Sequence, residues 1–111
     1  MKKAYEVTFK DGNEFKTTIV KGYTLIGALF KCDNNINVYE DVVAVKEITF
    51  ERYHALNMSF AIANADTWED CEDECAELCR LAGMGSEWRE ADGDTFEEVL
   101  IEAAKKLKVE I

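Results

Sequence analysis

The sequence predicts a small α+β fold, in which an antiparallel sheet forms the N-terminal half and amphipathic helices form the C-terminal half. Two β-rich runs flank an Asp-Gly turn near the N-terminus, and two helical patterns with clear end signals follow residue 66. A chain of 111 residues with 48% hydrophobic residues is long enough to bury a core without disulfides or metals. We therefore expect a single domain over residues 1–111, with the order β-β-α-β(-β) followed by two helices packed on the sheet.

The first two strands are expected at residues 4–9 and 15–20, which are rich in aromatic and β-branched side chains. Asp11-Gly12-Asn13 between them is a turn signal, so the two strands should form a hairpin. Gly22 then marks the end of the second strand.

A short helix is expected next, over residues 24–32, although Gly27 disfavours it. Its apolar side chains recur at helical spacing and are Leu25, Ile26, Leu29, Phe30 and Cys32. The strongest strand pattern of the chain follows at residues 42–53. Its apolar positions keep two phases, which a β-bulge near Lys46-Glu47 would reconcile.

Residues 54–65 fit either a strand or a helix. Met58, Phe60 and Ile62 alternate as in a strand, whereas the alanine content of the segment allows a helix. We favour a fourth strand, whose exposed edge would be able to pair with another chain.

The first helix of the C-terminal half is expected over about residues 67–82. Asp66 or Thr67 is its N-cap, and Gly83 ends it. Cys71, Cys75 and Cys79 recur every four residues along it and share one arc of the helix with Trp68, Leu78 and Ala82. This arc should be the buried stripe of the helix.

The second helix is expected over about residues 95–108, after the loop Asp92-Gly93-Asp94. Asp94 is its expected N-cap, with Glu97 in the capping-box position. The same loop with Glu97 and Glu98 would offer carboxylates to a cation, but it lacks the ligand spacing of an EF-hand. A turn followed by a helix cap is therefore the favoured interpretation.

The charge of the chain is concentrated in its second half. Residues 1–60 hold eight basic and eight acidic side chains, whereas residues 61–111 hold five basic and fifteen acidic ones, which accounts for the net charge of −10. Such a surface repels phosphate, so we expect no direct binding of DNA or RNA and a basic protein surface as partner. The alternative is a solvated acidic face that only keeps the protein soluble.

The first acidic helix supplies the candidate contacts to a basic partner. Its carboxylates lie opposite the cysteines and are Glu69, Asp70, Asp73, Glu74 and Glu77. Trp88, in the expected loop after this helix, is either a lid over the core or an interface anchor. These residues favour a non-enzymatic protein-binding module, in its most concrete form an inhibitor that blocks a basic nucleic-acid-binding groove by mimicking nucleic acid.

In size, in its N-terminal run Lys2-Lys3-Ala4-Tyr5-Glu6-Val7-Thr8-Phe9-Lys10-Asp11-Gly12 and in its acidic helical end, the chain resembles small acidic accessory proteins of phages and mobile elements. This class includes anti-restriction and anti-CRISPR inhibitors, some of which resemble DNA in charge. The resemblance implies an inhibitor whose partner is a basic nucleic-acid-binding protein.

The cysteines have a structural and a chemical interpretation. The favoured one is that Cys71, Cys75 and Cys79 are small hydrophobic residues in a helix interface. A zinc site is the alternative, although the spacing is purely helical and a fourth ligand would have to be Cys32 or His54. A redox role is disfavoured, because side chains four residues apart on a helix diverge and the nearby acids should raise the thiol pKa. We expect no cofactor.

No pattern in the sequence indicates an enzyme. His54 is the only histidine, and no nucleophile accompanies it in the sequence. The N-terminus lacks the pattern of a signal peptide, and no segment approaches the roughly 18 apolar residues of a membrane span. We therefore expect a cytoplasmic protein with reduced thiols and no catalytic residue.

Overall fold

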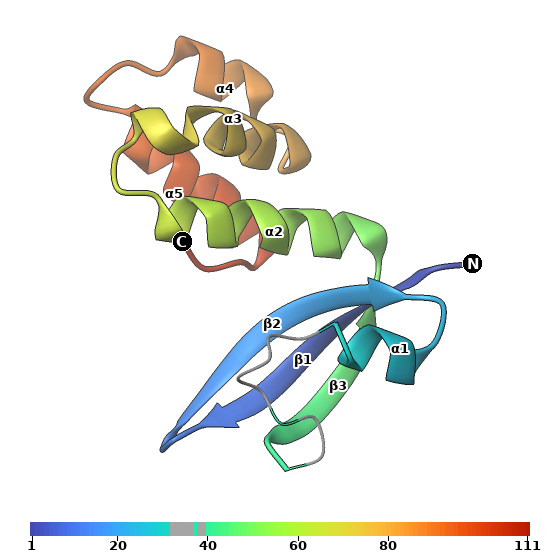
Figure 1. Ribbon diagram of the computed structural model, residues 1–111. Coiled ribbons are helices and arrows are strands. Elements are labelled where there is room, and N and C mark those ends of the chain that lie inside the picture. Colours follow the sequence, from blue (N-terminus) through green and yellow to red (C-terminus); the bar gives the residue numbers. More distant parts are fainter. Residues whose placement is uncertain (32–36, 38–39) are drawn as a thin grey trace. The chain divides into compact units, whose positions relative to one another are not determined.

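The computed structural model describes residues 1–31, 37 and 40–111, and its elements are shown in Figure 1. The chain divides into two compact units, Met1–Tyr53 and His54–Ile111, which are called unit 1 and unit 2 below. A three-stranded antiparallel sheet and several helices make the protein an α+β protein, as the sequence predicts. A single domain over residues 1–111 stays a prediction, and each unit is described by itself.

Unit 1 contains the sheet, formed by β1 (Lys3–Asp11), β2 (Glu14–Gly22) and β3 (Val42–Ile48) in the order β2-β1-β3. The predicted hairpin is confirmed, since Asp11 pairs with Glu14 across a two-residue turn. Gly12 in that turn has a φ of 65°, which is the left-handed region that favours glycine.

The short helix α1 (Leu25–Leu29) covers one face of this sheet. Thr24 caps it, since its Oγ1 accepts a hydrogen bond from the backbone N–H of Gly27 at 3.0 Å. A Cβ on Gly22 would lie 3.2 Å from the backbone of Ala28, so the glycine allows α1 to approach the strand closely. The core of unit 1 comprises Tyr5, Val7, Val20 and Ala28, with Leu29, Val42 and Val45 packed against it.

The predicted apolar face of this helix is partly wrong. Leu25, Ile26 and Phe30 are exposed, whereas Ala28 is fully buried, because close approach to Gly22 leaves room for only a small side chain. Cys32, the last residue of the predicted helix, lies outside the described residues.

Strand β3 differs from its prediction in where it ends and in where its bulge lies. It ends at Ile48, and the bulge lies at Val43, because the register against β1 shifts between Thr8 and Phe9. Lys46 and Glu47, the predicted bulge, pair regularly with β1. The extra residue at Val43 brings both Val42 and Val45 onto the core face, which is how two phases of apolar residues coexist in one strand.

Residues 50–64 form a helix, α2 (Phe50–Asn64), so the predicted fourth strand is wrong. The Oγ1 of Thr49 accepts a hydrogen bond from the backbone N–H of Arg52 at 3.1 Å and so caps the first turn. The buried side chains of α2 recur at helical and not at alternating spacing, and they are Ala55, Leu56, Ser59 and Ile62. The described part of the sheet therefore has three strands.

The expected helix at 67–82 is divided into η1 (Glu69–Cys71), a 3₁₀ turn, and α3 (Glu72–Leu81). Thr67, one of the two expected caps, accepts a hydrogen bond on Oγ1 from the backbone N–H of Asp70 at 3.3 Å. Gly83 ends α3 with a φ of 74°, as predicted.

Two further helices complete unit 2, namely α4 (Gly85–Glu90) and α5 (Phe96–Leu107). Helix α4 was expected to be a loop, so the prediction of only two helices in this half is wrong. Thr95 and not Asp94 is the N-cap position of α5, which excludes the predicted capping box.

Helix α3 packs against α4 and α5, and α4 also packs against α5. Leu78 of α3 and Leu100 of α5 are fully buried and are the largest such side chains of this unit. Among the described residues, no helix combines the length and apolar character needed to cross a membrane.

Candidate functional site

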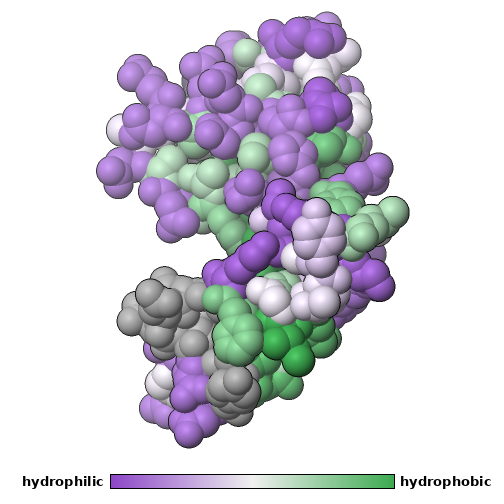
Figure 2. All heavy atoms as spheres, turned by 45° about the vertical axis from the view of Figure 1, so that its right-hand side comes forward, coloured by the Kyte–Doolittle hydropathy of each residue, from purple (hydrophilic) through white to green (hydrophobic). Residues whose placement is uncertain are grey.

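The boundary between the units coincides with the boundary in charge. Unit 1 holds eight basic and eight acidic residues, and unit 2 holds five basic and fifteen acidic residues. The net charge of −10 therefore belongs entirely to unit 2. Figure 2 shows hydrophilic side chains over much of the visible surface of this unit and a hydrophobic area on unit 1.

We call the five predicted partner-binding carboxylates on η1 and α3 the acidic face, and they are Glu69, Asp70, Asp73, Glu74 and Glu77. Glu69, Asp70 and Asp73 are exposed, whereas Glu74 and Glu77 are half-buried. Within unit 2, all of which the structure describes, no cationic side chain lies within ion-pair distance of Glu69, Asp70 or Asp73. These three charges are available to a partner.

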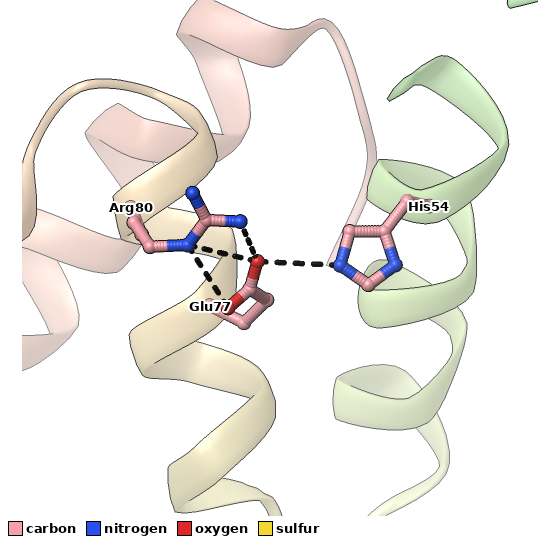
Figure 3. Close-up of polar contacts among 3 residues, drawn as sticks. All are labelled: His54, Glu77 and Arg80. Atoms are coloured by element: carbon pink, nitrogen blue, oxygen red, sulfur yellow. Dashed lines mark hydrogen bonds and ion pairs between the residues drawn. The ribbon is translucent and has the colours of Figure 1, made fainter. Parts of the chain in front are cut away.

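Glu77 differs from the rest of the acidic face because it is already paired. Figure 3 shows its carboxylate between the guanidinium of Arg80 and the ring of His54. Arg80 Nε donates to both carboxylate oxygens, at 3.0 and 3.1 Å, and His54 Nε2 lies 3.3 Å from Oε1. The bonds from Arg80, and then that from His54, lower the pKa of Glu77 despite its partial burial.

The contact between His54 and Glu77 joins α2 to α3. It could not be predicted from the sequence, because the two residues lie 23 positions apart. It leaves His54 half-exposed with an acidic partner. Among the hydrogen bonds of the described residues, none links His54 to the side chain of a serine, threonine or cysteine. In the described structure, this cluster links the carboxylate of Glu77 on α3 to His54 on α2.

A second feature of unit 2 is a groove floored by aromatic rings, which we call the aromatic groove. The ring of Phe96 lies 5.0 Å from that of Trp68 and 6.2 Å from that of Trp88, and both contacts are edge-to-face. The three rings come from the segment before η1, from α4 and from the start of α5. They line a hollow of about 690 Å³.

The charged residues that line the aromatic groove are mostly acidic. Glu69, Glu72 and Asp92 line it together with one cation, Arg89. Glu69 also belongs to the acidic face, so the two features are continuous. Trp68 is 45% exposed, which corrects its predicted place on the buried stripe, and Trp88 lies on helix α4 and not in a loop.

Hydrogen bonds fix Asp92 at the edge of this groove. Its Oδ1 accepts bonds from the backbone N–H of Asp94 at 3.0 Å and from the Thr95 hydroxyl at 3.2 Å. These bonds lower the pKa of Asp92, the backbone bond most, so its carboxylate stays ionised near neutral pH. Sequence reasoning assigned this segment to a turn but did not place it beside Trp68.

The cysteines are buried in the core of unit 2, as predicted. Cys71, Cys75 and Cys79 are each at most 2% exposed. The Sγ atoms of Cys71 and Cys75 lie 3.7 Å apart as free thiols. Burial, and then the hydrogen bond with Cys71, raises the pKa of Cys75 to about 12, and burial raises the pKa of Cys79.

The described residues contain no group of three or more histidine, cysteine, aspartate or glutamate side chains placed to hold a metal ion. This finding covers the cysteines of η1 and α3 and the acidic loop at residues 92–94. Cys32, named as a possible fourth ligand, lies outside the described residues.

No protein-family model, curated protein or solved structure matches this chain. The resemblance to small acidic proteins of phages and mobile elements therefore stays a prediction.

Proposed function

We propose that unit 2 is a non-enzymatic recognition module that binds a basic surface on a partner protein. The observation that carries this proposal is the set of exposed carboxylates of Glu69, Asp70 and Asp73, which unit 2 leaves without cationic partners. Asp73 lies in the first turn of α3, where the helix dipole favours an acid. The neighbouring carboxylates of Glu69 and Asp70 nevertheless repel it and each other. A basic partner would remove that repulsion on binding.

The finer form of the proposal is that the partner binds nucleic acid through the same basic surface. Carboxylates three or four positions apart on a helix are separated by about 5–6 Å. This spacing is on the scale of the phosphates that a nucleic-acid-binding groove accommodates. The acidic face would then occupy that groove and exclude DNA or RNA, as would an inhibitor encoded by a phage or mobile element.

Binding to a basic probe tests the general proposal. The probe is a fluorescein-labelled decapeptide of alternating glycine and arginine, and fluorescence anisotropy gives its Kd at low and high salt. The parent should bind it, and the affinity should fall steeply with salt because the contacting charges are exposed. The variant Asp70→Lys/Asp73→Lys should bind at least tenfold more weakly.

The matched control is Glu102→Lys/Glu110→Lys, which makes the same change in net charge at two exposed positions outside the acidic face. It should bind close to the parent affinity. If both double variants lost affinity equally, only the net charge would matter, and the acidic face would be a solvated surface.

Competition with duplex DNA tests the finer proposal. Immobilised protein is incubated with host lysate at low salt and washed, and bound proteins are then released with duplex DNA. Proteins bound by the parent, but not by Asp70→Lys/Asp73→Lys, should be released. If DNA released none of them, the mimicry of nucleic acid would be wrong, while binding of a basic partner would stand.

A further inference from the structure

We propose that the aromatic groove of unit 2 binds an arginine side chain from a short segment of the basic partner. This inference rests on the proposed function and names the partner chemistry at one place on the surface. It concerns Trp68, Trp88 and Phe96, whose rings floor the groove, and the carboxylates beside them.

The aromatic floor is the first support. Trp68 and Trp88 each stand nearly perpendicular to the ring of Phe96, with interplanar angles of 86° and 88°. Trp68, which lines the groove, is 45% exposed. Tryptophan is the ring that attracts a cation most strongly through its face, and arginine is the side chain most often found on it.

The charge around the floor is the second support. Glu69, Glu72 and Asp92 line the same hollow, and Asp92 is held in place by two hydrogen bonds. A carboxylate beside an aromatic face suits a guanidinium, which can stack on the ring and donate paired hydrogen bonds to the acid. An anionic ligand would be repelled, and an apolar ligand would leave the carboxylates without a partner.

Arg89 is the one opposing charge among the residues of this groove. Its Nη2 donates to the hydroxyl of Ser86 at 3.3 Å, which holds it on α4. Because Arg89 repels an incoming cation, Arg89→Gln should tighten binding of an arginine segment by about two- to fivefold.

The two tryptophans of the chain, Trp68 and Trp88, both line the groove, so intrinsic fluorescence reports on it directly. The glycine-arginine decapeptide is titrated while tryptophan emission and peptide anisotropy are both recorded. Emission should change with the same Kd as anisotropy. Trp68→Leu, which leaves the charge unaltered, should weaken binding about five- to tenfold.

Salt separates the groove from the acidic face. At high salt the effect of Asp70→Lys/Asp73→Lys should shrink, whereas the ratio between Trp68→Leu and the parent should persist, because stacking on a ring is screened less than exposed charge. Phe15→Leu removes an exposed aromatic ring of unit 1 and serves as the matched control, with unchanged binding. Circular dichroism verifies that each variant is folded.

Binding and tryptophan emission together separate the groove from the acidic face. If anisotropy reports binding but emission does not change and Trp68→Leu binds like the parent, the groove proposal is overturned and the proposed function stands. If the parent does not bind the decapeptide by either signal, both proposals fall. Tighter binding by Arg89→Gln, with weaker binding by Trp68→Leu, supports the groove.

Discussion

The two units of this protein differ in net charge and in how many of their charged side chains form ion pairs. Unit 1 is neutral, and among its described residues two ion pairs join opposite charges, Lys3 with Glu47 at 3.2 Å and Lys16 with Asp11 at 2.8 Å. Unit 2 carries the whole net charge of −10, and Glu77 is its one carboxylate in an ion pair. The charges of unit 1 therefore balance within the unit, whereas unit 2 carries fifteen acidic residues against five basic ones.

The surface carboxylates and the apolar core of unit 2 contribute differently to its stability. Neighbouring carboxylates on η1 and α3 repel each other, and the helix dipole offsets this only in the first turn, so the stability of unit 2 comes mainly from its apolar core. Leu78, Leu100 and the thiols of Cys75 and Cys79 supply that core. The carboxylates can therefore be substituted without removing a core side chain, and the core can be tested separately from them.

The largest expected effect is the loss of a core side chain from unit 2. Leu78 is fully buried, so Leu78→Ala should lower the free energy of unfolding by about 2–5 kcal/mol. Urea unfolding followed by tryptophan emission measures it, since both tryptophans belong to this unit. Ile101→Ala, at a position that is 41% exposed, should cost much less. Equal losses from the two variants would contradict the assigned core.

The thiols of unit 2 provide the next test. A rise in the pKa of Cys75 from 9.0 to about 12 lowers its thiolate fraction at pH 8 by about a thousandfold. In a Cys32→Ser background, Cys75 of the native protein should therefore react very slowly with iodoacetamide, and rapidly once the protein is unfolded in urea. Mass spectrometry identifies the labelled residue. Fast labelling of Cys75 in native protein would show that it is a reactive thiol and not a core residue.

A smaller effect is expected at the glycines that each unit uses in the left-handed region. Gly12 has a φ of 65° in the hairpin of unit 1, and Gly83 has a φ of 74° at the end of α3. Replacing either by alanine should cost about 1 kcal/mol, although no atom lies near the added Cβ. Gly93→Ala, at an open position without a positive φ, should be neutral or slightly stabilising. Thermal unfolding of the three variants checks this order.

The sequence predicted unit 1 better than unit 2 because the signals of unit 1 are local. Asp11-Gly12-Asn13 joins two β-rich runs, so the hairpin needed no tertiary information. The bulge of β3 was misplaced because the sequence pattern counts Val43 with Val45 as an inward-facing residue, whereas Val43 is 54% exposed. Only pairing with β1 places it at Val43.

Helix α2 was missed for a physical reason that its buried residues make clear. Ser59 is 1% exposed and lies within the apolar stripe of α2. A polar side chain is tolerated there because its hydroxyl donates a hydrogen bond to the carbonyl of Leu56 at 2.8 Å. Because a serine is not counted as an apolar residue in the sequence, the helical stripe is incomplete there, and the alternation of Met58, Phe60 and Ile62 dominates the pattern. The cap at Thr49 was the remaining local signal for a helix.

Part of the candidate site was predictable and part was not. The carboxylates of η1 and α3 follow from helical spacing, and the structure exposes three of them as expected. The aromatic groove brings together Trp68, Trp88 and Phe96 from three segments of the chain. One of these segments, helix α4, was not predicted, because Gly83 and Gly85 indicated a loop there. Such a site depends on packing between elements, which periodicity does not report.

The smallest expected effect concerns the one paired carboxylate of the acidic face. The bonds of Arg80, and then that of His54, lower the pKa of Glu77 below its usual 4.5, so ionised Glu77 stabilises the folded state above that pH. This stabilisation should disappear as the pH falls below 4.5 and through the lowered pKa of the folded state, when the carboxyl becomes protonated. Glu77→Gln should therefore be less stable than the parent at pH 7 and equal to it in strong acid. Glu74→Gln, the same change at a half-buried position of α3 without an ion pair, should not narrow its difference from the parent in this way. Urea unfolding between pH 7 and pH 3 measures both differences, and a constant gap for Glu77→Gln would show that its ion pairs add no stability.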